Sequence, residues 1–254
     1  MKTISSIALL SLAIAAAAMA APAQTADQTA RGFEVRGFDR IELSGCDVVT
    51  VALGSAYAVT ARGRAANIAN LRIDTNGSTL RIRRRSDSCN GHDRRVAIAI
   101  TLPALQAVNV SGAGEMTLPA LATRAFAVTA SGAGVVRLPA LRGGSASFGL
   151  SGASQLSVGG LQVERASLDA SGASVLRVAG AVRQLGIDGS GASDVDARGL
   201  SAPSVTIGAS GTAKVRARST EQAQIGASGM ASVTVDGHPR CTVSKSGLAR
   251  VTCA

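Results

Sequence analysis

The dipeptide Ser-Gly recurs at nearly constant intervals from the middle of the chain to its end, and no other feature of the sequence limits the fold as strongly. The eight repeats are 18 to 20 residues apart in a chain of 254 residues, and they begin at Ser111, Ser131, Ser151, Ser171, Ser190, Ser210, Ser228 and Ser246. A period this regular is typical of a solenoid, in which each unit stacks on the one before it.

Apolar and polar residues alternate on both sides of each Ser-Gly. Counted from the Ser as position 0, positions −3, +5 and +7 are apolar in every repeat, whereas +4 and +6 are often polar. Position +5 holds Met116, Val136, Leu156, Leu176, Val195, Val215, Val233 and Val251. Position +2 is mostly small and holds Ala113, Ala133, Ala153, Ala173, Ala192, Thr212, Met230 and Leu248. A period of two predicts two short strands that meet at a corner, and we expect position +2 to face the inside of that corner.

The sequence therefore predicts an all-β protein, a single-stranded parallel β-helix with about 18–20 residues per coil. The chirality of parallel crossovers favours a right-handed helix. Ordering the backbone costs about 1–2 kcal/mol per residue, whereas each large buried side chain returns roughly 1.5–3 kcal/mol. One coil alone is therefore unstable, and several coils must stack on one another.

Residues 32–105 depart from the regular pattern that covers residues 106–254. The segment "ELSGCDVVTVALG" resembles a single coil, with Val49 and Val51 at positions +5 and +7. The segment "LRIDTNGSTLRIR" alternates on both sides of Asn76-Gly77, which is a strong signal for a two-residue hairpin turn. We expect this N-terminal region to contain a hairpin and to cap the first edge of the stack.

The first 23 residues have the features of a secretory signal peptide. Lys2 precedes an apolar run that ends in small residues, so that cleavage is expected after Ala20 or Ala23. No comparable apolar run follows, and the mature chain is expected to have no transmembrane segment. The protein is therefore predicted to be periplasmic, on the cell surface or secreted.

Four cysteines in an exported chain favour disulfide bonds over free thiols. Cys241 and Cys253 occupy inward positions of the same last coil, where a bond between them would close a short loop and hold the terminus. Cys46 and Cys89 are the remaining pair. A buried free-thiol role is the weaker alternative.

The chain carries a formal charge of +10, and its arginines concentrate around "SDSCNGHD". This cluster consists of Arg81, Arg83, Arg84, Arg85, Arg94 and Arg95. It is interpreted either as a solvated hairpin tip with acidic neighbours or as a patch for an anionic polymer such as an anionic glycan. Aromatic residues make up 2% of the chain and Trp is absent, so the means to stack nucleic-acid bases are lacking.

No motif in the sequence indicates a catalytic centre, a metal site or a cofactor. Neither His92 nor His238 has a Cys or His at ligand spacing. Asp169 and Asp188 share position −2 of successive coils and would form a stacked pair of carboxylates, as polysaccharide-cleaving enzymes require. Other repeats place Asn, Thr or Gly there, however, and we expect neither a cleft nor an aromatic subsite. The protein is therefore predicted not to be an enzyme.

The ordered blocks "GFDRIELSGCDVVTV", "LRIDTNGSTLRIR" and "ITLPALQAVNVSGAGEMTL", followed by repeated "SGAS", resemble the head GIN domain family of bacterial envelope auto-transporter adhesins. The resemblance extends from Gly32 to the end of the chain. It implies an exported β-helix without a catalytic site to carry over.

These observations together predict an exported, non-enzymatic envelope protein, an adhesin-like module whose flat β-helix faces bind an envelope polymer or a partner protein. A polysaccharide-processing enzyme and a structural, self-associating element are the alternatives.

Overall fold

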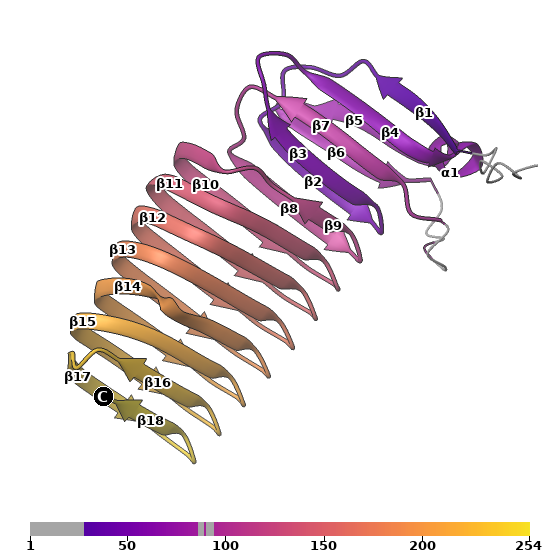
Figure 1. Cartoon of the computed structure of the whole chain (residues 1–254). Coiled ribbons are helices and arrows are strands. Elements are labelled where there is room, and N and C mark those ends of the chain that lie inside the picture. Colours follow the sequence, from indigo (N-terminus) through magenta and orange to yellow (C-terminus); the bar gives the residue numbers. More distant parts are fainter. Residues whose placement is uncertain (1–27, 86–88, 90–93) are drawn as a thin grey trace, which may run out of the picture.

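A computed structural model describes residues 28–85, 89 and 94–254 of the protein (Figure 1). The described chain is 70% β-strand with almost no helix, and it forms a parallel β-solenoid of about seven turns. The predicted all-β, β-helical fold class is thus confirmed. The predicted signal peptide lies outside the described residues, as do His92 and part of the arginine-rich loop.

Long, bent strands form the regular part of the stack. The longest of them run from one Ser-Gly corner to the next, and each pairs in parallel with the strand or strands one turn later. These strands are β10 (Leu121–Ala130), β11 (Val135–Leu150), β12 (Gln155–Ala170), β13 (Val175–Gly189), β14 (Asp194–Ala209) and β15 (Lys214–Ala227). The last turn is divided among β16 (Ser232–Asp236), β17 (Arg240–Lys245) and β18 (Arg250–Cys253).

The core is a set of aliphatic columns that run along the axis of the stack. Val136 pairs with Leu156, and Leu156 pairs with Leu176, so that residues one period apart lie above one another. The side chains of all three are buried. The apolar positions −3, +5 and +7 thus face inward in successive coils, because strand pairing preserves the register of the repeat.

The prediction for position +2 is wrong. Ala133, Ala153 and Ala173 at this position are exposed, whereas position +3 is buried throughout the regular coils. The corner turns at Ser-Gly with the glycine at positive φ, and this turn directs the residue at +2 outward and the next residue inward. The inside of the corner is therefore filled by Ser154, Ser174 or a residue of similar size.

Successive corners lie too close together for a side chain at the glycine. Gly152 has a φ of +68°, and a Cβ on it would lie 2.6 Å from the carbonyl oxygen of Gly132. The next backbone N–H, that of Ala153, donates to the same oxygen at 2.6 Å. Glycine is required here by both its conformation and the close approach of the adjacent coil.

The N-terminal cap is built from shorter strands. These are β1 (Gln28–Phe33), β2 (Arg40–Gly45), β3 (Val48–Leu53), β4 (Ala58–Arg64), β5 (Leu71–Asn76), β6 (Thr79–Arg84), β7 (Ala97–Leu102), β8 (Ala107–Gly112) and β9 (Glu115–Thr117), with the short helix α1 (Ala65–Ala69). The hairpin predicted at Asn76-Gly77 is β5–β6, in which Asn76 pairs with Thr79. Three pairs of these strands are antiparallel: β4 with β7, β5 with β6, and β1 with β4. The cap thus ends the parallel stack with antiparallel strands.

The first coil in the sequence is not the first coil in the stack. β2 pairs in parallel with both β6 and β8, and β3 pairs in the same way with β7 and β9. The coil β2–β3 therefore lies between two pairs of strands that follow it in the chain. This arrangement places Ser44 directly beside Ser111, and their hydroxyl groups are 2.8 Å apart.

The two ends of the stack differ. Antiparallel strands and α1 cover one end, whereas β17 and β18 form the other (Figure 1). Among the described strands, β18 pairs with β16 alone. Within the described residues, no helix has the length and apolar character needed to cross a membrane.

Candidate functional site: a serine-lined groove

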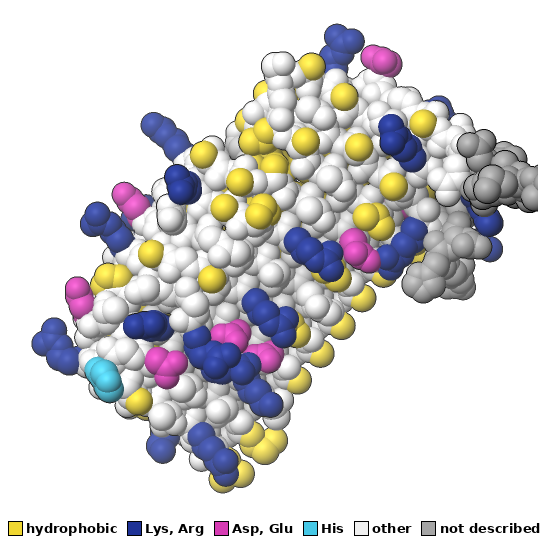
Figure 2. All heavy atoms as spheres, in the orientation of Figure 1, with side chains coloured by type: hydrophobic (Ala, Val, Ile, Leu, Met, Phe, Trp, Pro, Cys, Tyr) yellow, Lys and Arg dark blue, Asp and Glu magenta, His cyan; other side chains and the backbone are white. Residues whose placement is uncertain are grey.

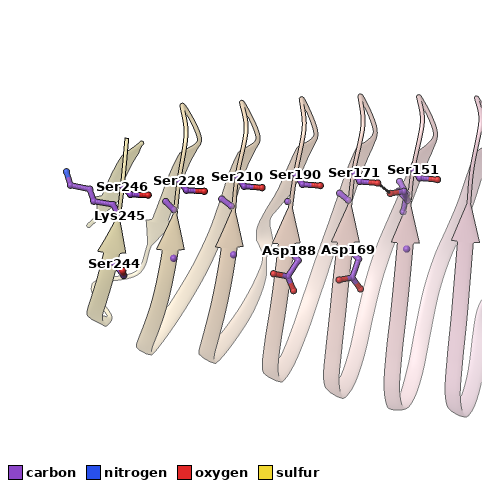
Figure 3. A pocket seen from close by; sticks show the side chains of 18 of the residues that line it. Ser151, Asp169, Ser171, Asp188, Ser190, Ser210, Ser228, Ser244, Lys245 and Ser246 are labelled. Carbon is purple, nitrogen blue, oxygen red and sulfur yellow. Dashed lines mark hydrogen bonds between the residues drawn. The ribbon is translucent and has the colours of Figure 1, made fainter. Parts of the chain in front are cut away.

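A groove with a volume of about 780 Å³ runs along the stack beside the Ser-Gly corners. We call it the serine groove, and it is lined by Thr129, Gly149, Leu150, Ser151, Asp169, Ala170, Ser171, Asp188, Gly189, Ser190, Gly208, Ala209, Ser210, Gly226, Ala227, Ser228, Ser244, Lys245 and Ser246. Figure 3 shows the corner serines in a row with their side chains pointing in the same direction. One hydroxyl per coil thus recurs at the strand spacing of about 4.8 Å.

The sequence forms this groove by placing small residues where each strand approaches its corner. Position −1 faces inward, while position −2 faces outward and is glycine in Gly149, Gly208 and Gly226. Without side chains at these positions, the outer surface is hollowed between the corner serines and the rest of the strand. The hollow follows the axis of the solenoid because the same residue types recur in successive coils.

Several of the corner hydroxyls are available to a ligand. Ser171 Oγ donates to the carbonyl oxygen of Leu150 at 3.2 Å. Ser190, Ser210 and Ser228, in contrast, make no side-chain hydrogen bond with any described residue, and all three are partly exposed. A hydroxyl group donates one hydrogen bond and accepts two, so this row can bind a ligand that has polar groups along its length.

The carboxylates of Asp169 and Asp188 project from adjacent strands into the same groove (Figure 3). Ser167 Oγ donates to Asp169 Oδ2 at 3.1 Å, and neither carboxylate forms an ion pair with a described residue. The expectation that this face has no cleft is wrong, because the glycines at position −2 in neighbouring coils create one. The expected lack of an aromatic subsite agrees with the groove lining, which contains no aromatic residue.

The arginine cluster is not a uniform, free surface patch. Arg84 is buried, with 3% of its side chain exposed, and it pairs with Asp47, whose side chain is fully buried. Asp47 occupies position +3 of the coil β2–β3, where regular coils have a small residue, and this polar substitution accommodates the guanidinium. Arg84 therefore stabilises the cap and is unavailable to a polymer, contrary to its place in the predicted patch.

Three further arginines of the cluster lie next to acids. Arg83 pairs with Asp74 at 3.0 Å, Arg81 lies 3.6 Å from Glu42, and Arg95 contacts Glu115 at 2.6 Å. The hydrogen bond from Arg95, with a weaker contribution from Arg137, holds the pKa of Glu115 below its usual value. Arg85 and Arg94 are exposed. The pair Arg83–Asp74 lies within the predicted hairpin, whose tip the sequence provides with acidic neighbours. The sequence did not reveal the other two pairs, because Glu42 and Glu115 come from other strands.

The cysteines are paired as the sequence predicts for the cap. Cys46 is bonded to Cys89, and this bond ties the corner of the coil β2–β3 to the loop between β6 and β7. Cys241 and Cys253 are also joined, with their Cα atoms 6.7 Å apart in the last coil. Within the described residues, no group of three or more His, Cys, Asp or Glu side chains is arranged to hold a metal ion.

Sequence reasoning missed a second hollow on the same strands, with a volume of about 830 Å³. Small residues at positions −4 and −6, such as Ala127, Ser147 and Gly186, form its surface, and Arg40 and Arg165 lie along it. The sequence signal for this hollow is a second column of small, outward-facing residues, which the pattern of inward positions does not reveal.

The comparisons with known proteins agree with this architecture. The family model described as "Putative auto-transporter adhesin, head GIN domain" matches residues 37–239. A comparison with curated proteins found no match.

Three solved structures share the fold. A "putative adhesin" from Parabacteroides distasonis ATCC 8503 is 16% identical, with 90% of this chain and 97% of that chain covered and a TM-score of 0.81. A "putative adhesin" from Parabacteroides merdae ATCC 43184 is 15% identical, with 91% and 97% covered and a TM-score of 0.80. A "Putative lipid binding protein" from Parabacteroides distasonis ATCC 8503 is 15% identical, with 91% and 98% covered and a TM-score of 0.81.

Proposed function

The chain belongs to the head GIN domain family, and from this membership we propose that it is an exported, non-enzymatic binding module of the cell envelope. We propose further that its serine groove binds an extended, hydroxyl-rich polymer, of which a neutral glycan chain is the best match. The family description as an adhesin supports a surface or envelope location and a binding role.

The observation that carries this proposal is the row of unpaired hydroxyls in a continuous groove. Ser190, Ser210 and Ser228 repeat at the strand spacing along about 780 Å³ of open volume. Each hydrogen bond contributes about 0.5–1.5 kcal/mol net, so that one sugar unit would bind weakly and a chain that contacts several coils would bind measurably. A linear polymer that lies along the axis meets this requirement.

The charges in the groove favour a neutral polymer over an anionic one. Asp169 and Asp188 lie within the groove, and Lys245 is the only Lys or Arg in its lining. A polyanion placed along the groove would bring its charges against both carboxylates. An anionic glycan would instead have to use the exposed members of the arginine cluster, such as Arg85 and Arg94, and that binding would weaken with added salt.

The groove can be filled without straining the backbone. A Cβ on Gly149 would have no atom within 4 Å, and one on Gly226 would meet only the carbonyl oxygen of Ile207 at 3.9 Å. The double variant Gly149→Leu/Gly226→Leu therefore introduces bulk into the groove and leaves the coils intact. Gly160→Leu is the matched control, because its surroundings are similarly open and it lies outside the groove.

The test is isothermal titration of the protein with a soluble linear glucan and, separately, with dextran sulfate. We expect the double variant to bind the glucan at least about tenfold more weakly, which is the effect of losing one or two hydrogen bonds, and the control to bind normally. If both variants bound the glucan as tightly as the wild type, the serine groove would not be the glucan-binding site. Salt-sensitive binding of dextran sulfate alone would assign the binding role to the arginines.

A second candidate function is cleavage of a polysaccharide, and it is favoured by the adjacent positions of Asp169 and Asp188 in the groove. Paired carboxylates are the catalytic groups of most glycoside hydrolases. Shortening of the glucan by the wild type, abolished by Asp188→Asn, would establish this activity and refute the non-enzymatic proposal. Intact polymer after prolonged incubation supports binding alone.

A further inference from the structure

The C-terminal end of the stack carries most of the large apolar side chains that the described chain exposes. Leu248 is 77% exposed, Met230 61% and Val243 44%. Leu53, at 43%, is the one comparable residue elsewhere among the described residues. An exposed apolar group of this kind is typical of a surface that contacts a partner or a membrane.

Met230 and Leu248 lie next to one another at the tip of the last corners. Both occupy position +2, which faces outward, and their backbone N–H groups donate to the corner glycines of the preceding coils, Gly211 and Gly229. Figure 2 shows hydrophobic side chains in a row along one edge of the stack, with a larger group at its end. In earlier coils this position holds Ala or Thr, so that the apolar row becomes prominent only here.

The chain that follows Asp236 of β16 is basic. Residues 237–254 contain Arg240, Lys245 and Arg250 and neither Asp nor Glu. All three cations are exposed, and none makes an ion pair with a described residue. Figure 3 shows Lys245 extending away from the last coil. This lysine takes the place of the buried, uncharged residue found at position −1 of the other coils, which is most often Ala.

We propose that this C-terminal corner, formed by Met230, Leu248, Lys245 and Arg250, docks on a lipid bilayer with anionic headgroups. The apolar side chains project from a convex tip, which suits insertion into a deformable interface. The surrounding cations contact the headgroups, as in other interfacial anchors that combine apolar burial with basic residues. A second copy of this chain is disfavoured as the partner, since two such ends would bring like charges together.

The proposal is independent of the function proposed for the serine groove, with which the corner shares Lys245 alone. The test therefore leaves Lys245 unchanged. The full mature chain is sedimented with vesicles of phosphatidylcholine, with and without phosphatidylglycerol. We expect binding only when phosphatidylglycerol is present, and we expect added salt to weaken it.

Variants separate the two contributions to binding. Met230→Ser/Leu248→Ser should reduce partitioning by about tenfold or more, because it removes the two apolar side chains that the bilayer would bury. Arg250→Gln should reduce partitioning about fivefold, the effect of one cation near an anionic surface. Leu53→Ser removes an apolar side chain of similar exposure at the other end and should leave partitioning unchanged.

Insertion depth gives a second readout. The chain contains no Trp, so Leu248→Trp introduces a single Trp emitter. Its emission should shift to the blue on vesicle binding and be quenched by brominated lipid, whereas Leu53→Trp should show neither effect. Binding that is equal in all variants, or absent from anionic vesicles, would overturn the proposal. So would sedimentation velocity showing a dimer that the Met230/Leu248 variant loses, because that result would assign the corner to a second copy.

Discussion

The guanidinium of Arg84 and the carboxylate of Asp47 form a buried ion pair within the N-terminal cap. Arg84 Nε donates to Asp47 Oδ2 at 3.0 Å, and the backbone N–H of Val96 donates to Oδ1 at 2.9 Å. The carboxylate thereby joins the corner after β2, the end of β6 and the residue before β7. A single buried group thus connects three segments that are distant in the sequence.

Asp47→Ala should lower the free energy of unfolding by about 3–5 kcal/mol, because it leaves the Arg84 guanidinium buried without its counterion. Asp47→Ser combined with Arg84→Met should recover part of that loss, since the double variant removes both charges and restores the small residue usual at position +3. Urea denaturation followed by circular dichroism measures both values. A double variant less stable than Asp47→Ala would contradict this account.

Glu115 should contribute to the dependence of stability on acid. Arg95 holds the pKa of this carboxyl below its ordinary value of 4.5 in the folded protein, so the charged form favours folding at higher pH. This contribution is lost as the pH falls through the lowered pKa. Glu115→Gln should therefore reduce stability at neutral pH, and its stability should converge with that of the wild type in acid. Glu164→Gln, at an exposed site without an ion pair to the described residues, is the control for thermal denaturation across this pH range.

The corner glycines should tolerate no side chain. Gly152→Ala should cost more than about 1 kcal/mol, because Gly152 has positive φ and an added Cβ would meet Gly132 O at 2.6 Å. Gly149→Ala, three residues earlier, has no atom within 4 Å of the new Cβ and should change stability little. Equal midpoints of chemical denaturation for the two variants would argue against the stacked corners.

The orientation of the corner can be tested at two neighbouring residues. Ala213, at position +3, is fully buried, whereas Thr212 at position +2 is exposed. Ala213→Leu should overpack the inside of the corner and cost about 1–3 kcal/mol. Thr212→Leu loses only the exposed hydrogen bond from Thr212 Oγ1 to Gly191 O and should cost about 0.5–1 kcal/mol, less than Ala213→Leu. If Thr212→Leu were instead the less stable variant, position +2 would face inward, as the sequence suggested.

The bond between Cys46 and Cys89 should stabilise the cap by restricting the unfolded chain. The bonded residues are 43 positions apart, and the chain-entropy model gives about 4 kcal/mol for a loop of that length. Cys46→Ala/Cys89→Ala should lower the denaturation midpoint accordingly under oxidising conditions. The wild type and the variant should become alike after reduction, and a persistent difference would point to packing at Cys46.

Much of the solenoid could be predicted because one period determines both register and burial. Once Val136, Leu156 and Leu176 share a position in the repeat, parallel pairing stacks them. Which residue of the corner faces inward could not be predicted in the same way. Ala153 and Ser154 are both small, and the difference between them depends on the turn geometry at Gly152, which alternation of apolar residues does not encode.

The candidate site was harder to predict than the core. The sequence placed Asp169 and Asp188 together, as found, but the groove depends on the absence of side chains at Gly149, Gly208 and Gly226. The burial of Arg84 cannot be predicted from its neighbours in the sequence, because its partner Asp47 is 37 residues away. Short-range patterns identify a cluster of charge, but they do not show which members are neutralised by distant strands.

The position of the coil β2–β3 has a consequence for the time at which the protein can fold. A chain made from its N-terminus produces this coil early, yet its neighbours on either side, β6–β7 and β8–β9, come later. Ser111 follows Ser44 by 67 residues. β6 can pair with one edge of β2 earlier, but the other edge has no partner until β8 has been made. Each later coil can pair with a preceding coil that is already folded. The solenoid can therefore grow one turn at a time, but only after β2–β3 has paired with the strands that follow it in the chain.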